Sequence, residues 1–73
     1  MTVADLRAWQ TQMGYTYDTA AAALDMSRSG YAKMVLGHTT IDRRTALACA
    51  AIVAGIPPWS ADSNKFQAGV LGK

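Results

Sequence analysis

Polar and apolar positions follow a helical period over most of this chain. The first group of large apolar side chains recurs three and four residues apart, at Leu6, Trp9 and Met13. This spacing puts them on one face of a helix. Thr2 is suited to capping the start of such a helix, Asp5 follows it by three residues, and Gly14 is suited to ending it. The pattern predicts a first helix over residues 3–13.

Two further apolar faces follow, and they do not fit one continuous helix. Their members are Ala20 with Leu24, four residues apart, and Tyr31 with Met34, three residues apart. The sequence therefore predicts two short helices, over residues 17–24 and 28–36, with a tight turn between them. Ala21 is a small residue that lets two crossing helices approach closely. This spacing is typical of a helix–turn–helix, which places its second helix in the DNA major groove.

Polar residues at the ends of these two helices support the same division. Thr16 and Ser27 are good N-cap residues, and Gly37 is suited to ending the second of the two helices. Asp25 falls in the turn, where it tolerates a positive φ better than most residues other than glycine. Gly30 costs roughly 1 kcal/mol relative to alanine inside a helix. Its presence indicates either simple tolerance in the first turn or the close approach of a partner backbone.

A fourth helix is predicted over residues 43–54. Asp42 is its expected N-cap and Gly55 its expected end, after which two prolines prevent continuation. We expect the inward face of this helix to consist of residues spaced by three and four, namely Leu47, Ala50, Ala51 and Ala54. Ile56 is expected to pack back on the core, and Trp59 to cover the end of the bundle.

The predicted structure is all-α, a compact bundle of four to five helices. At 73 residues the chain is long enough for one small domain. Residues 1–59 are expected to form that domain, and residues 60–73 a C-terminal tail that is either flexible or used in dimerisation. No apolar run is long enough to span a bilayer and no signal peptide is expected, so the cytoplasm is the expected location.

Composition argues against catalysis. The chain has one histidine, one cysteine and no glutamate. It shows no Ser–His–Asp grouping, no cluster of metal ligands and no glycine-rich phosphate loop. Cys49 stands alone in an alanine-rich run and is expected to be a small buried residue. We therefore expect no enzyme activity, no metal, no cofactor and no small-molecule substrate.

The basic residues are unevenly distributed, although the formal net charge is only +2. Arg28, Lys33, Arg43 and Arg44 fall within seventeen residues that contain one acid, Asp42. The positive charge therefore lies on the second half of the two-helix motif and on the helix after it. Placement of this kind supports a nucleic-acid partner more than the net charge does.

Taken together, residues 6–59 resemble the lambda-repressor-like family of phage repressor and Cro proteins. The resemblance is strongest over residues 17–36, where the small residue Ala21 and the apolar positions fall as they do in that family. Three positions depart from the family pattern. Asp25 stands where glycine is usual, Tyr17 where glutamine is frequent, and Val35 where glutamate is frequent.

This resemblance implies a role for each polar residue near the motif. The helix over 28–36 would enter the major groove, and its expected base-reading residues are Arg28, Ser29, Ala32 and Lys33. Residues at the edges of that surface would bind phosphates: Thr16, Tyr17, Ser27, His38, Thr39, Thr40, Arg43 and Arg44. Two adjacent arginines at a helix start oppose the helix dipole, and a bound anion would remove that cost.

A single motif reads only a short half-site, so the resemblance implies a homodimer on a palindromic operator in double-stranded DNA. The expected dimer contacts are Trp59, Phe66, Val70 and Leu71. A Cro-type repressor is the function that this implies. A protein-binding module on the same fold, such as an antitoxin or an inhibitor, is the alternative. No membrane partner is expected.

Overall fold

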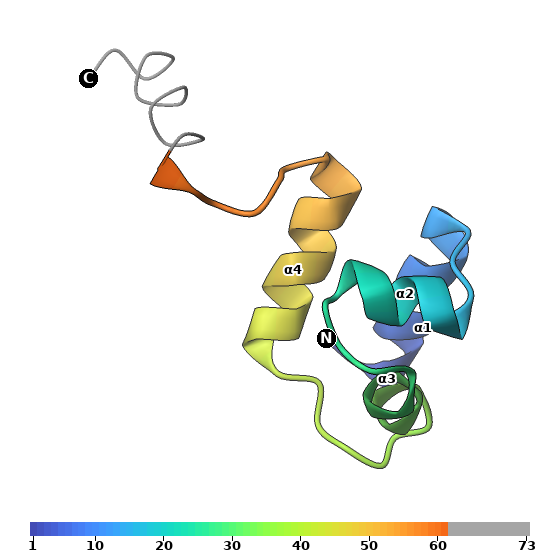
Figure 1. The fold of residues 1–73 in the computed structure, drawn as a ribbon. Coiled ribbons are helices and arrows are strands. Elements are labelled where there is room, and N and C mark those ends of the chain that lie inside the picture. The colour runs from blue at the N-terminus through green and yellow to red at the C-terminus, as the bar shows by residue number, and fades with distance from the viewer. Residues whose placement is uncertain (62–73) are drawn as a thin grey trace.

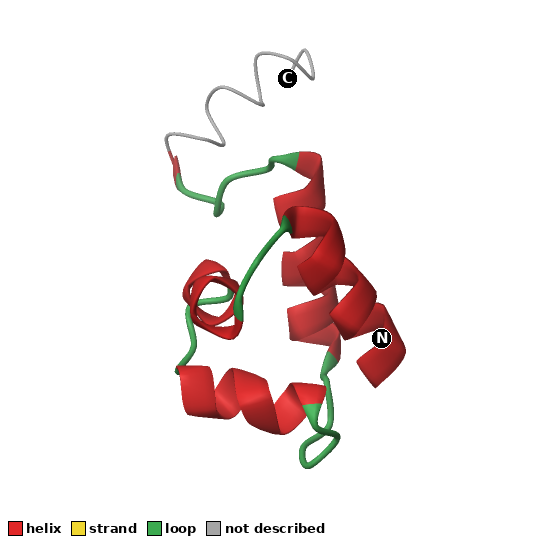
Figure 2. Cartoon of the chain, turned by 90° about the vertical axis from the view of Figure 1, so that its right-hand side faces the viewer, coloured by secondary structure: helices red, strands yellow, loops and turns green. Residues whose placement is uncertain are grey.

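Four helices make up the part of the chain that the computed structural model describes, residues 1–61 (Figure 1). They are α1 (Val3–Met13), α2 (Tyr17–Ala23), α3 (Arg28–Val35) and α4 (Arg43–Ala54). Figure 2 shows only helices and connecting loops over this range, with no strand. The predicted all-α class is therefore confirmed for residues 1–61. Predictions for Phe66, Val70 and Leu71 lie outside the described residues.

Each helix begins at the N-cap residue that the sequence predicts. The hydroxyl of Thr2 accepts a hydrogen bond from the amide of Asp5 at 3.1 Å, and the Asp5 carboxylate accepts one from the amide of Thr2 at 2.8 Å. This reciprocal pair satisfies two of the amides that a helix start leaves unpaired. The hydrogen bond from the Thr2 amide lowers the pKa of Asp5. Gly14 ends α1 with a φ of 70°, a conformation that glycine adopts without strain.

The core lies where α1, α2 and α3 meet. Its buried apolar residues from these helices are Leu6, Trp9, Ala20, Ala21, Tyr31, Met34 and Val35, and α4 adds Cys49. α2 and α3 form the most closely packed pair of helices, and α3 also packs on α1. The buried alanines of α2 permit this close approach, as predicted for Ala21. Cys49 is buried as expected, and burial raises the pKa of its thiol.

One polar network fastens α3 to α1. The Tyr31 hydroxyl donates to Gln10 Oε1 at 2.8 Å, and Gln10 Nε2 donates to the carbonyl oxygen of Tyr15 at 3.2 Å. Burial raises the pKa of Tyr31 to about 12. Among the side-chain polar atoms of the described residues, Trp9 Nε1 is the one that is buried with no acceptor.

The inward face predicted for α4 is wrong for three of its four residues, while the fourth, Ala51, is half-buried. Cys49 is buried and Ile52 is half-buried against the core, whereas Leu47, Ala50 and Ala54 are exposed. The physical reason is that residues 46–54 are all apolar, so the sequence pattern does not select one face over another. The helix is rotated so that Cys49 and Ile52 point inward.

The segment after α4 also differs from its prediction. Ile56 and Trp59 are both exposed, so neither is packed into the core. With Pro57 and Pro58 they line a largely apolar hollow of about 460 Å³ that extends over Ile52 to the end of α2. Over residues 1–61, none of the helices combines the length and the apolar character needed to cross a membrane.

Candidate nucleic-acid interface

α3 has one buried face and one exposed face. Tyr31, Met34 and Val35 are buried, and they fix the rotation of the helix. The opposite side carries three exposed residues, Ser29, Lys33 and Leu36, and the half-buried Ala32. They share one arc because Ala32, Lys33 and Leu36 follow Ser29 by three, four and seven residues. Residues 28–36 contain no acid. Three of the four residues expected to read bases thus lie together on an outward surface that carries Lys33 as its cation.

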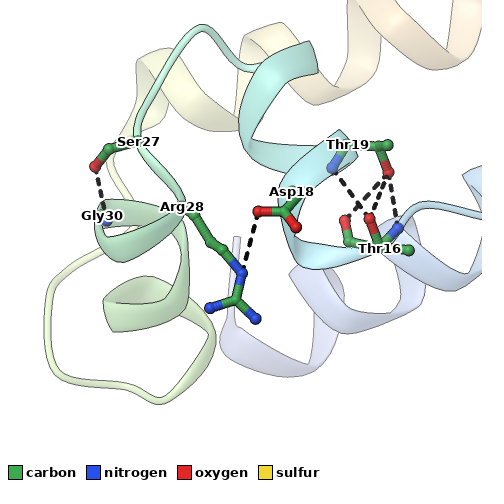
Figure 3. Close-up of polar contacts among 6 residues, drawn as sticks. All are labelled: Thr16, Asp18, Thr19, Ser27, Arg28 and Gly30. Atoms are coloured by element: carbon green, nitrogen blue, oxygen red, sulfur yellow. Dashed lines mark hydrogen bonds and ion pairs between the residues drawn. The ribbon is translucent and has the colours of Figure 1, made fainter.

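Arg28, the fourth residue expected to read bases, lies at the start of α3. It has a partner that the sequence did not predict. Its Nε atom lies 3.1 Å from Asp18 Oδ1 in the first turn of α2 (Figure 3). Its guanidinium also lies over the Tyr17 ring, 5.6 Å from the ring centre. The Arg28 and Asp18 side chains remain 64% and 75% exposed. Arg28 is therefore held at the surface by two residues of α2.

Tyr17 lies between the two helices. Its ring meets the Tyr31 ring edge-on, with 5.7 Å between ring centres, and it is half-buried against the core. The face of the same ring supports Arg28. Tyr17 therefore positions α3 and Arg28. The sequence predicted a phosphate contact for Tyr17 but not this positioning role.

The end of α3 is fixed from α1 and from the following loop. Arg7 Nη2 donates a long hydrogen bond of 3.4 Å to the carbonyl oxygen of Val35. The amide of His38 donates to the carbonyl oxygen of Lys33 at 2.8 Å, and the amide of Gly37 donates to the carbonyl oxygen of Met34 at 3.1 Å. A cation beside the last carbonyls of a helix is favourable for the helix dipole. The exposed face of α3 is thus held at both ends.

At the start of α2, internal hydrogen bonds use part of what was expected to bind phosphate. The Thr16 amide donates to Thr19 Oγ1 at 2.8 Å, and the Thr19 amide donates to Thr16 Oγ1 at 3.2 Å (Figure 3). The Thr16 amide therefore already has an acceptor within the chain, and the phosphate contact of Thr16 stays a prediction. The amides of Tyr17 and Asp18 remain at this end, beside the Asp18 carboxylate.

Ser27 caps α3 and keeps a hydrogen-bond donor for a ligand. Its Oγ accepts from the amide of Gly30 at 3.0 Å (Figure 3), and its hydroxyl proton remains available to an acceptor. A side-chain carbon at Gly30 would lie 3.2 Å from Ser27 Oγ and 3.3 Å from the end of Met26. This crowding at the cap favours glycine here, in addition to the two expected reasons.

Two arginines lie at the start of α4. Arg44 forms an ion pair, whereas Arg43 forms none among residues 1–61. Asp42 Oδ1 accepts from the amide of Thr45 at 2.9 Å, and Arg44 Nη2 lies 3.2 Å from Asp42 Oδ2. The hydrogen bond from the Thr45 amide lowers the pKa of Asp42. Because Asp42 already places a negative charge at this helix start, the expected need for a bound anion to offset the arginines is reduced. Arg43 is exposed.

The start of α4 lies next to the turn between α2 and α3. Asp42, Arg44 and Thr45 line one hollow of about 400 Å³ with Asp25 and its neighbours in that turn. Asp25 has a φ of 56°, as the sequence predicts for this position. Arg44 shares this hollow with two acidic side chains, whereas Arg43 does not line it.

His38, Thr39 and Thr40 form an exposed loop directly after α3. They line a small hollow of about 280 Å³ with Met1, Val3 and residues that flank the loop. The three residues therefore lie together beside the end of α3. Over residues 1–61, no group of three or more metal-ligating side chains is brought together.

No family model matches this chain, and neither does any curated protein or solved structure. The resemblance to lambda-repressor-like proteins therefore depends on the residues and on their spacing alone.

Three residues near α3 were missed by sequence reasoning. Leu36 shares the outward arc with Ser29 and Lys33, and helical spacing was sufficient to find it. Asp18 and Arg7 act across gaps of ten and twenty-eight residues in the chain. No local pattern encodes such contacts, because they depend on how the helices cross.

Proposed function

We propose that this protein is a sequence-specific DNA-binding regulator of the Cro type, which binds a palindromic operator as a homodimer. In this proposal α2 and α3 form the helix–turn–helix of a lambda-repressor-like domain, and α3 enters the major groove. Such a regulator would act where the DNA lies, in the cytoplasm of a bacterial host.

The observation that carries this proposal is the exposed face of α3. It combines a cation, a hydroxyl, a methyl group and an apolar side chain, and it contains no acid. Lysine pairs with guanine O6 and N7, serine with several bases, and alanine or leucine with the thymine methyl group. The buried side of the same helix fixes which of its residues reach outward.

Arg28 supplies the second cation for base reading. Its guanidinium is held at the surface by Asp18 and Tyr17, so it starts close to the position from which it would approach a base. A bidentate contact with guanine contributes on the order of 1–3 kcal/mol of discrimination. An exposed ion pair contributes only about 0.2–1 kcal/mol. We therefore expect a gain in free energy when Arg28 exchanges its contact with Asp18 for a contact with guanine.

Phosphate contacts in this proposal come from residues that surround α3. Arg43 offers an exposed cation, and Ser27 offers a hydroxyl proton. Thr39 and Thr40 offer further hydroxyl groups in the loop after α3. These contacts would fix the orientation of α3 on the duplex and carry no sequence information themselves.

The experiment that tests the proposal is selection from a pool of random duplexes with the purified full chain. We expect an enriched inverted repeat, with half-sites separated by about one helical turn of DNA. The enriched site is then used to compare Lys33→Ala with Arg43→Ala. Lys33→Ala should relax the preference at one position of each half-site, whereas Arg43→Ala should weaken binding to all sequences alike. No enrichment over the starting pool would contradict the proposal.

A second candidate function is a protein-binding module, such as an antitoxin or an inhibitor. The observation that favours it is the large amount of exposed apolar surface on α4 and beyond, which includes Leu47, Ile56 and Trp59. Salt separates the two functions, because binding to phosphates weakens steeply as salt rises and an apolar interface does not.

A further inference from the structure

The outer side of α4 is apolar and uncovered in the described part of the chain. Residues 46–54 include no polar side chain, yet Leu47 is 57% exposed and Val53 is 48% exposed. Figure 1 shows α4 along one side of the other three helices, with its far side facing no described element. A helix that is apolar all round is normally buried on all sides. An exposed apolar face of this kind is suited to contact with a partner.

We propose that this face, made of Leu47, Ala50, Val53 and Ala54, is where two copies of the chain associate, with their α4 helices antiparallel about a two-fold axis. The inference rests on the proposed function for the requirement of two copies. It moves the dimer contact from Trp59 and the tail to the middle of α4.

Shape supports a second copy as the occupant. Leu47, Ala50 and Ala54 follow one another at spacings of three and four residues, so they form one stripe along the helix. The two alanines permit close approach of another helix near the middle of the stripe. With the axis at Ala50, Leu47 of each copy lies against Val53 and Ala54 of the other, so one surface serves both copies.

A groove beside the stripe extends the same surface toward α1. Ala50 and Val53 line it with Ala8 and Trp9, and its volume is about 420 Å³. Asp5 and Gln12 also line the groove, so a second helix laid along α4 would cover its apolar part beside Ala50 and Val53. The contact would then bury surface from both α4 and α1, which increases the apolar area removed from water.

Charge selects the antiparallel arrangement. Arg43 and Arg44 stand at the N-terminal end of α4, and the last turn contains no basic residue. Parallel helices would bring four arginines together at one end. In the antiparallel pair, each arginine pair lies beside the C-terminal end of the other helix, where the helix dipole favours a cation. Arg43 continues the stripe at its N-terminal end, four residues before Leu47, so this charge lies at the edge of the apolar contact.

The first test is sedimentation velocity of the full chain without DNA, over a range of concentrations. The wild type should show a dimer that dissociates on dilution, and Leu47→Glu should raise the dissociation constant at least about tenfold, because it buries a carboxylate in an apolar contact. Leu36→Glu is the matched control, because Leu36 is 56% exposed but lies on α3. It should leave the dimer unchanged.

The second test fixes the orientation and does not depend on a charged substitution. In a Cys49→Ala background, Ala50→Cys should form a disulfide between copies, because residue 50 lies at the axis. Leu47→Cys should not, because antiparallel helices place the two copies of residue 47 on opposite sides of the axis. Cross-linking of both variants alike would indicate parallel helices and overturn the arrangement.

Three other results would overturn the interface itself. They are a wild type that stays monomeric at high concentration, equal weakening by the two leucine substitutions, and a dimer that Val70→Glu dissociates but Leu47→Glu does not. The last result would assign the contact to the tail. None of these measurements uses DNA, so failure of the interface is distinguishable from failure of the proposed function.

Discussion

At the scale of single residues, the pairing of Arg28 with Asp18 decides how α3 presents its first cation. The ion pair joins the two helices at 3.1 Å, and the Tyr17 ring supports the guanidinium from one side. The partner carboxylate lies close to where a phosphate backbone would approach. Asp18 holds Arg28 in place, and in the proposed complex its charge would repel a phosphate backbone that approaches from the wrong side.

Asp18→Asn should raise affinity for random DNA and reduce the preference for the selected operator. The substitution removes a negative charge beside the interface and releases Arg28 to bind any phosphate. We expect the ratio of specific to non-specific affinity to fall by about threefold to tenfold, as a loss of about 0.7–1.4 kcal/mol implies. Competition binding at fixed salt measures that ratio. Asp25→Asn removes the same charge in the turn and should leave the ratio unchanged, so an equal fall in both variants would exclude a specific role for Asp18.

At the scale of helices, the attachment of α3 to α1 depends on one hydroxyl. Tyr31 reaches Gln10 across the core, and Gln10 in turn binds the backbone at Tyr15. These bonds connect α1, the loop after it and α3. The orientation of the candidate DNA-reading helix is thus fixed by a contact made on its buried side.

Tyr31→Phe should reduce the free energy of unfolding by about 1 kcal/mol, because it leaves Gln10 Oε1 without its donor while the ring still fills the core. Urea denaturation followed by circular dichroism measures this change. Tyr17→Phe is the control, since residues 1–61 provide no hydrogen bond to the Tyr17 hydroxyl. It should change stability by less than about 0.5 kcal/mol. If both substitutions cost the same, the bond to Gln10 does not fasten the two helices.

The helix caps predict how stability depends on pH. Asp5 and Asp42 accept hydrogen bonds from backbone amides, and these bonds lower the pKa of each carboxyl below 3.8 in the folded chain. A carboxyl with a lower pKa in the folded state stabilises it above the unfolded value and loses this effect as pH falls. The melting temperature should therefore drop as pH falls below 3.8. Asp42→Asn keeps a good N-cap and should reduce this drop, which a series of melting curves from about pH 6 to about pH 3 would show. An unchanged drop would contradict the contribution of Asp42.

At the scale of the whole molecule, local signals were enough for the helices and insufficient for their assembly. The sequence predicts each helix start, because the N-cap side chain accepts a hydrogen bond from the amide three residues later. The four N-cap residues are Thr2, Thr16, Ser27 and Asp42. The rotation of α4 could not be predicted, because residues 46–54 are all apolar and packing alone chooses the buried side. The exposed residues of α3 were predicted because Tyr31 and Met34 mark its buried side.

The response to salt tests the molecule as a whole, because it counts the phosphates that all the basic residues contact together. For duplex DNA the logarithm of affinity falls with the logarithm of salt, with a slope of about −0.9 for each phosphate neutralised. In the proposed dimer, each copy places Arg43 on a phosphate. Replacing Arg43 by alanine should therefore make the slope less negative by about 1.8. Arg44→Ala should change the slope less, because Arg44 already pairs with Asp42. Titration of the operator complex at several salt concentrations measures both. A wild-type slope near zero would contradict binding through phosphates. Equal effects of the two substitutions would remove the distinction between the paired and the unpaired arginine.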